Sequence, residues 1–158
     1  MSSDPIDALV EQWQRERPGL DARPMATVGR LLRAARRVDE AIESQLAGHG
    51  LQVGWFDVLS ALRRAGAPHR LTPGQLTRAL MLSTGGMTKR LDRMQDAGLV
   101  ERTVADGDRR SVLVALTPHG LTLIDRVVED HLANEERLLR DLTQADRTRL
   151  ERLLARIG

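Results

Sequence analysis

The fold is decided by residues 72–118, which read TPGQLTRALMLSTGGMTKRLDRMQDAGLVERTVADGDRRSVLVALTP. Thr72 and Gln75 form a capping-box pattern with a proline between them, which predicts the start of a short helix. A second helix is expected after Ser83, because apolar residues recur there at helical spacing: Met87, Leu91 and Met94. Two helices joined by so short a turn predict a helix-turn-helix.

The last part of the stretch changes to the periodicity of strands. Residues 99–104 and 112–116 are rich in β-branched side chains, and Asp106-Gly107 between them is a strong hairpin turn signal. Two short helices followed directly by a hairpin are the parts of a winged helix-turn-helix. This is the fold that the central stretch predicts.

Helices are expected on both sides of this centre. Upstream, Asp4-Pro5 begins a short helix that stops at Pro18-Gly19, a long helix runs from Pro24 to Gly48, and a third carries Phe56. Downstream, Thr117-Pro118 and Thr143 begin two more helices. The fold class is therefore mainly α. We expect three parts: N-terminal helices in 1–50, the winged helix in 51–117 and C-terminal helices in 118–158.

Composition excludes several classes of protein. The 158 residues include 24 Lys and Arg against 22 Asp and Glu, so a nucleic-acid site has to come from the arrangement of charges and not from bulk charge. Without cysteine the chain has no disulfide and no zinc–cysteine site. It also has no apolar run long enough to span a bilayer, so we expect a cytoplasmic protein.

No catalytic pattern is present. The four histidines lack a zinc-ligand spacing, and the sequence contains no Gly-x-Ser-x-Gly elbow, P-loop or dinucleotide fingerprint. We therefore expect no enzyme activity, no metal site and no cofactor. His131 lies on or beside an apolar helix stripe and is expected to be a packed or dimer-face residue and not a ligand.

The second helix of the central pair is the predicted DNA-reading element. Small residues in its first turn let the backbone approach DNA closely, and free N–H groups at a helix N-terminus attract phosphate. Hydroxyl and cationic side chains can then reach base edges and phosphates in the major groove. The predicted contacts on this helix are Ser83, Thr84, Gly85, Gly86, Thr88, Lys89 and Arg93.

The tip of the hairpin is a second predicted DNA contact. Arg109 and Arg110 beside a glycine turn can enter the minor groove, where arginine senses groove width and negative potential. Asp108 can orient one guanidinium through a bidentate pair. The alternative is that Asp108 and Arg110 only brace the hairpin.

These motifs resemble the MarR family of bacterial transcriptional regulators. The resemblance is carried by residues 82–91, by Gly98-Leu99-Val100-Glu101-Arg102, and by residues 108–120, in which the Asp-x-Arg wing precedes an apolar strand and Leu-Thr-x-x-Gly. It covers about residues 25–157. It implies a homodimer with interlocked N- and C-terminal helices that binds a pseudo-palindromic operator, usually as a repressor released by a small ligand.

Apolar stripes at the two chain ends independently favour a dimer. The stripes in 28–42, 121–138 and 150–157 have more apolar surface than the small central module can cover. A dimer would present two recognition helices to major grooves ~34 Å apart. The alternative is an ordinary monomeric core.

An added N-terminal helix is similar to that of the urate-responsive branch of the family. In that branch a Trp, an Asp and two Arg are implicated in the ligand response, and the matching positions are Trp13, Asp57, Arg90 and Arg102. An aromatic wall with guanidinium donors suits a flat anionic heterocycle such as urate. Two alternatives stay open: a different aromatic or anionic ligand, and a structural role in which Trp13 caps the dimer core and Asp57 pairs with a neighbouring Arg.

The second class of function is a winged-helix protein-interaction module without sequence-specific DNA binding. Such a module should lack small polar residues at the helix start and a basic wing tip, and this chain has both. The salt dependence of duplex binding distinguishes the two classes, because counterion release makes affinity for DNA fall steeply with salt.

Overall fold

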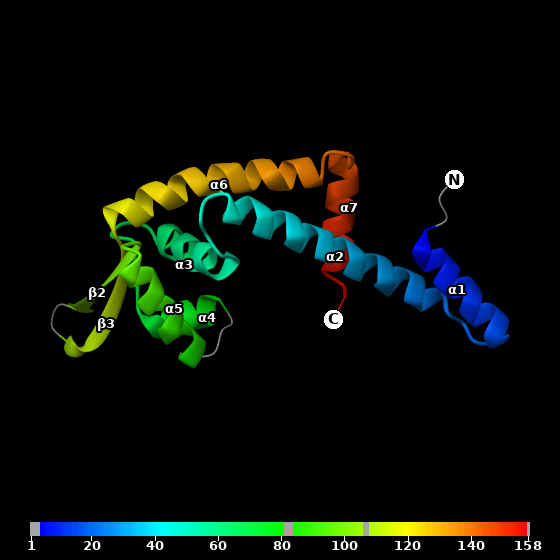
Figure 1. The fold of residues 1–158 in the computed structure, drawn as a ribbon, viewed down its shortest axis with the longest axis horizontal. Coiled ribbons are helices and arrows are strands. Elements are labelled where there is room, and N and C mark those ends of the chain that lie inside the picture. Colours follow the sequence, from blue (N-terminus) through cyan, green and yellow to red (C-terminus); the bar gives the residue numbers. More distant parts are fainter. Residues whose placement is uncertain (1–3, 81–83, 106–107, 158) are drawn as a thin grey trace. The chain divides into compact units, whose positions relative to one another are not determined.

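The structure is a computed structural model that describes residues 4–80, 84–105 and 108–157 (Figure 1). The described helices are α1 (Pro5–Glu16), α2 (Arg23–Ala47), α3 (Val53–Arg64), α4 (Pro73–Ala79), α5 (Thr84–Asp96), α6 (Pro118–Leu138) and α7 (Gln144–Leu154). The described strands are β1 (Arg70–Leu71), β2 (Val100–Ala105) and β3 (Asp108–Leu116). The predicted helices, hairpin and mainly α class are confirmed, whereas β1 was not predicted.

The chain divides into two compact units, residues 1–41 and 42–158. The first unit holds α1 and most of α2. The second holds the end of α2, the helix pair α4–α5, the sheet, and helices α3, α6 and α7. The functional division at residues 50 and 117 stays a prediction.

In the first unit, charge ties α1 to α2. Asp4 caps α1 and accepts a hydrogen bond from the backbone N–H of Ile6 at 3.1 Å. The same carboxylate pairs with Arg30 at 3.1 Å and with Arg33 at 2.7 Å. The backbone hydrogen bond and the two arginines hold the pKa of Asp4 below its usual range. Protonation of this carboxyl at low pH therefore removes an anchor of α1.

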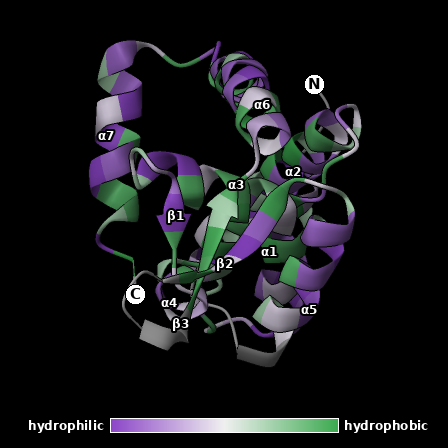
Figure 2. Ribbon diagram, turned by 90° about the vertical axis from the view of Figure 1, so that its left-hand side faces the viewer, coloured by the Kyte–Doolittle hydropathy of each residue, from purple (hydrophilic) through white to green (hydrophobic). Residues whose placement is uncertain are grey.

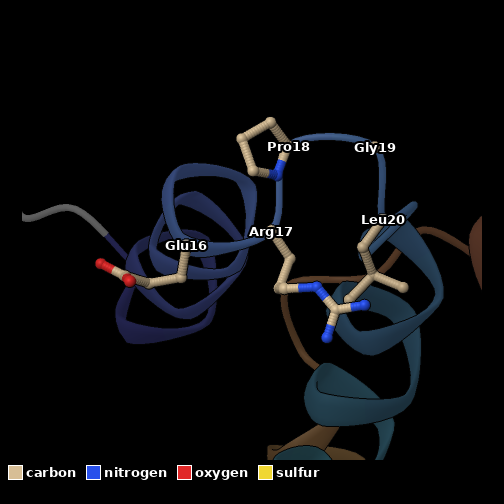
Figure 3. Close-up of a pocket in the computed structure, with 5 residues that line it drawn as sticks. All are labelled: Glu16, Arg17, Pro18, Gly19 and Leu20. Atoms are coloured by element: carbon tan, nitrogen blue, oxygen red, sulfur yellow. The ribbon is translucent and has the colours of Figure 1, made fainter.

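A glycine makes the turn between α1 and α2 possible. Gly19 has a φ of +133°, which L side chains rarely adopt. Figure 3 shows the side chains of Arg17 and Leu20 turned toward each other beneath this turn and that of Glu16 pointing away. The predicted stop of the first helix at Pro18-Gly19 is confirmed.

The core of the second unit joins α3, α5 and α6 to the sheet. Its fully buried side chains are Leu46, Val58, Leu59, Leu62, Leu76, Met87, Leu91, Met94, Val100, Val114, Ile124 and Val127. Since the three apolar residues of α5 all enter this core, the opposite face of α5 is left to solvent. The burial of that one apolar stripe fixes the rotation of α5 about its axis.

The strands form an antiparallel sheet in the order β1-β3-β2. β2 and β3 make the predicted hairpin, paired from Val100 and Leu116 to Val104 and Val112. β1 adds to the other edge of β3, where Arg70 pairs with Ala115. Two residues are too few for a periodic pattern, which is why the sequence did not reveal β1.

Helices α6 and α7 end the chain. Arg147 of α7 donates hydrogen bonds to both carboxylate oxygens of Glu136 on α6, each at 2.7 Å. Hydrophobic and hydrophilic residues mix along α7 (Figure 2). Its apolar stripe, which Ile157 continues just beyond the helix, is exposed in the single chain, with Leu153 48% and Ile157 59% accessible.

Candidate nucleic-acid interface

Helix α4 packs against helix α5, the predicted DNA-reading element. The Thr72 hydroxyl accepts from the backbone N–H of Gln75 at 3.1 Å, and the Gln75 side-chain oxygen accepts from the backbone N–H of Thr72 at 2.8 Å. This predicted capping box is confirmed. The buried Leu76 then packs α4 into the core of the second unit.

The solvent face of α5 carries the predicted DNA contacts. Gly86, Thr88, Lys89 and Arg93 are all exposed. Lys89 and Arg93 are four residues apart, so they lie on one side of the helix. Thr84 and Gly85 belong to the first turn of α5, but their exposure lies outside the described part of the chain, and Ser83 lies outside the described residues.

The wing residues stand at the far end of the hairpin from the core. Asp108, Arg109 and Arg110 begin β3, and the backbone of Asp108 pairs with Ala105 where the strand register shifts. Their side chains lie outside the described part of the chain. Minor-groove contact and the alternative brace within the hairpin therefore both stay predictions.

Two predicted effector residues lie close together behind α5. The guanidinium of Arg90 lies against Gly54 in the first turn of α3, where an added Cβ would be 2.5 Å from Arg90 Cζ. Burial raises the pKa of Asp57, also on α3, while the positive charges of Arg90, Arg64 and His131 lower it. Arg90 therefore connects α5 to the first turn of α3, and its charge acts on Asp57 of the same helix.

The other two predicted effector residues have different surroundings. Arg102 on β2 forms an ion pair with Asp92 of α5 at 2.6 Å. Trp13 belongs to the first unit and is 39% exposed in an apolar groove of about 530 Å³. The groove is lined by Ile6, Leu9, Trp13, Pro24, Met25, Val28, Gly29 and Leu32. The grouping of all four effector residues in one site stays a prediction.

A pocket of about 220 Å³ lies between α3 and α6. Phe56 and His131 form its aromatic wall, with ring centroids 4.5 Å apart. Within the described residues, Ser60 Oγ and His131 Nδ1 are buried without a hydrogen-bond partner, which is uncommon for buried polar atoms. His131 is packed, as expected, but no sequence signal predicted the pocket.

Among residues 4–80, 84–105 and 108–157, no group of His, Asp or Glu is arranged to hold a metal ion. No helix in those ranges is long and apolar enough to cross a bilayer.

Comparison with known proteins identifies the family. Residues 49–111 match the MarR family. The HTH-type transcriptional regulator PecS of Dickeya dadantii (strain 3937) is 41% identical over 152 residues, which cover 96% of this chain and 92% of PecS. The chain belongs to the MarR family. The multiple antibiotic resistance protein MarR of Salmonella typhimurium is 30% identical over 132 residues, 82% of this chain and 90% of that protein.

Solved structures of MarR-family members share the fold. AbsC from Streptomyces coelicolor matches with a TM-score of 0.77 and 28% identity over 85% of this chain and 91% of AbsC. A mutant MarR from E. coli complexed with operator DNA matches with a TM-score of 0.71 and 27% identity over 90% of this chain and 95% of that chain. This chain is therefore a MarR-family transcriptional regulator and not an enzyme.

Sequence analysis missed two residues that the structure brings into the site. Asp92 holds Arg102, and Gly54 makes room for Arg90. Asp92 follows Thr88 by one helical turn, so both lie on the same face of α5. The sequence alone does not show that β2, which carries Arg102, packs beside this face. Gly54 carries no turn signal, because it lies within a helix.

Proposed function

We propose that this MarR-family regulator binds operator DNA as a homodimer and represses transcription by occupying the operator. The α5 helix enters the major groove and the β2–β3 wing reaches the minor groove. The observation that carries the proposal is the exposed face of α5, with Gly86, Thr88, Lys89 and Arg93 opposite a fully buried apolar face. A MarR of the same fold from E. coli has been crystallised with operator DNA.

Two copies are needed because a pseudo-palindromic operator presents two half-sites, with centres ~34 Å apart. Apolar side chains in the N- and C-terminal helical parts are exposed and could be buried in a dimer interface. Among them, Leu32 is 65% exposed and Ile157 is 59% exposed. We assign dimerisation to the helices in 1–50 and 118–158. DNA binding then belongs to 51–117, and a regulator of this kind works in the cytoplasm, where bacterial DNA lies.

Salt dependence of duplex binding tests the proposal. The affinity of the dimer for DNA upstream of its own gene should fall steeply as salt rises, because bound phosphates release counterions. Lys89→Ala should reduce the slope by roughly one unit if Lys89 meets phosphate. A flat salt dependence would instead favour the protein-interaction module.

The wing is tested separately with Arg110→Ala. Loss of one specific groove contact should weaken operator binding by ~1–3 kcal/mol in a correctly folded variant. Wild-type affinity of Arg110→Ala would remove the wing from the DNA contact and leave Asp108 and Arg110 as a brace of the hairpin.

We also propose that a small aromatic or anionic ligand, with urate as the first candidate, regulates DNA binding. Two observations support a ligand. Arg90 extends from the recognition helix α5 to Gly54 on α3, and its charge lowers the pKa of Asp57, so an anion that attracts Arg90 would act on the position of α5. The half-exposed Trp13 offers an aromatic wall in an apolar groove.

Urate titration tests the ligand. Saturating urate should raise the melting temperature of the wild type, since a ligand that binds only the folded state stabilises it. Trp13→Phe should reduce the shift. If the wild type shows no shift while xanthine or salicylate gives one, urate is replaced by a different aromatic anion.

A further inference from the structure

Arg102 is held on the recognition helix by several acceptors. Its guanidinium lies 2.6 Å from Asp92 Oδ1, and it makes longer contacts of 3.4 Å to the carbonyl oxygen of Thr88 and to Gln95 Oε1. Residues 88, 92 and 95 are spaced by four and three, so they lie on one face of α5. A single guanidinium on β2 therefore contacts residues from two successive turns of the helix.

Arg102 lies where apolar packing of the wing ends. Side chains alternate along a strand, so Val100, Arg102 and Val104 share one face of β2. Val100 is 1% exposed and Val104 is 58% exposed, while the side chain of Arg102 is intermediate at 29%. The ion pair with Asp92 thus links the hairpin to α5 at the edge of the core, where hydrophobic contact no longer holds it.

We propose that Arg102 is a positioning residue that fixes the wing relative to the recognition helix through its ion pair with Asp92. The inference rests on the proposed binding of operator DNA by both elements. If α5 and the wing are held in their relative position before binding, less conformational freedom is lost when both enter their grooves. Arg102 is partly buried whereas Asp92 is exposed, so only the guanidinium side of the pair is withdrawn from the solvent that weakens fully exposed ion pairs.

A purely electrostatic role would give the two partners opposite effects. Phosphate attracts Arg102 and repels Asp92, so loss of the arginine would weaken DNA binding and loss of the carboxylate would strengthen it. A positioning role makes both changes weaken binding, because each breaks the same ion pair. Asp92→Asn is therefore the variant that separates the two roles.

The experiment measures operator affinity, together with hydroxyl-radical protection of the DNA, for the wild type, Arg102→Ala, Asp92→Asn and the exchanged pair of Arg102→Asp with Asp92→Arg. Each single change should weaken operator binding roughly tenfold, the size expected for coupling between neighbouring residues. Protection of the flanking minor groove should fall more than protection at the recognition helix. The exchanged pair should recover most of both.

Arg63→Ala is the matched control, because it breaks an ion pair of the same 2.6 Å length, with Asp125, between α3 and α6. It should leave operator affinity unchanged. Melting temperature and dimer mass are measured for every variant, and Asp92→Asn, at an exposed position, keeps the test valid if Arg102→Ala fails to fold.

Three results overturn the inference: tighter operator binding by Asp92→Asn, no recovery in the exchanged pair, or an Arg102→Ala that binds like the wild type but no longer responds to urate. The last would assign Arg102 to a ligand. A wild type that binds no duplex would contradict the proposed function itself, so the two failures are distinguishable.

Discussion

At the scale of single residues, two glycines in the second unit exclude a side chain for different reasons. A Cβ on Gly120 would collide with the backbone carbonyl of Leu99, which the sheet and the start of α6 hold in place. A Cβ on Gly54 would meet only the end of the Arg90 side chain, which can rotate away. The first obstacle is rigid and the second is flexible.

Gly120→Ala should therefore lower the free energy of unfolding by about 2–3 kcal/mol, the upper range for overpacking. Gly54→Ala should lower it by less than about 1 kcal/mol, while moving Arg90 away from its place behind α5. Urea denaturation of both variants measures the difference. Equal losses would mean that Arg90 is held as firmly as the backbone.

Asp57 gives a pH-dependent prediction. Burial raises its pKa, so the native state binds this proton more tightly than the unfolded state does. The contribution of Asp57 to stability is then greatest at low pH and declines as pH rises through the raised pKa. Asp57→Asn, which keeps the shape without the charge, should melt at a higher temperature than the wild type at neutral pH. The gap should close as pH falls below the ordinary aspartate pKa of about 3.9, where the carboxyl is protonated in both the native and the unfolded state. A gap that widens on acidification would show that Arg90 and Arg64 outweigh burial.

The residues of the candidate site differ in how well the sequence predicts them. The exposure of Lys89 and Arg93 could be predicted, because helical periodicity alone separates them from the buried Met87 and Leu91. Arg102 could be singled out only by resemblance, and its partner Asp92 not at all, since the distance between β2 and α5 is a property of the folded chain.

At the scale of helices and strands, the boundaries that could be predicted are those set by local hydrogen bonds. Thr72 and Thr143 cap α4 and α7 with side chains only three residues from their partners, so the pattern is visible in the sequence. β1 depends on pairing between Arg70 and Ala115, far apart in the chain, and no local signal announces it.

Thr117 makes both a local hydrogen bond and a hydrogen bond to a residue far away in the sequence. Its hydroxyl accepts from the backbone N–H of Gly120 at 2.9 Å, which caps α6, and it donates to the carbonyl oxygen of Gly98 at 2.7 Å, which ties α6 to the end of α5. Thr117→Ala should lower the free energy of unfolding by about 1–2 kcal/mol. Thr117→Ser, which keeps the hydroxyl, should recover most of the loss. Denaturation of the two variants checks this, and equal losses would show that the methyl group of Thr117 matters more than its hydrogen bonds.

At the scale of the whole molecule, the second unit has a well-buried core and yet an exposed apolar stripe along α7. The stripe consists of Leu150, Leu153, Leu154 and Ile157, each more than a third exposed. The cap stabilises α7, and the hydrogen bonds from Arg147 to Glu136 tie its first turn to α6 without burying this stripe. A helix held in place with its apolar side uncovered is what a subunit interface requires.

Leu153→Glu should therefore convert the dimer to monomers and abolish operator binding, because a charge buried without a partner in the interface costs several kcal/mol. Thr148→Glu is the matched control. It adds the same charge to the same helix, but at helical spacing Thr148 faces away from the stripe. Sedimentation measures the mass of each variant, and circular dichroism shows whether each subunit stays folded.

Since a single recognition helix meets only one half-site, the folded monomer should lose operator binding even though α5 and the wing are unchanged. A dimeric Leu153→Glu would move the interface away from α7, and a folded monomer that still binds the operator with wild-type affinity would show that the DNA site needs one subunit only.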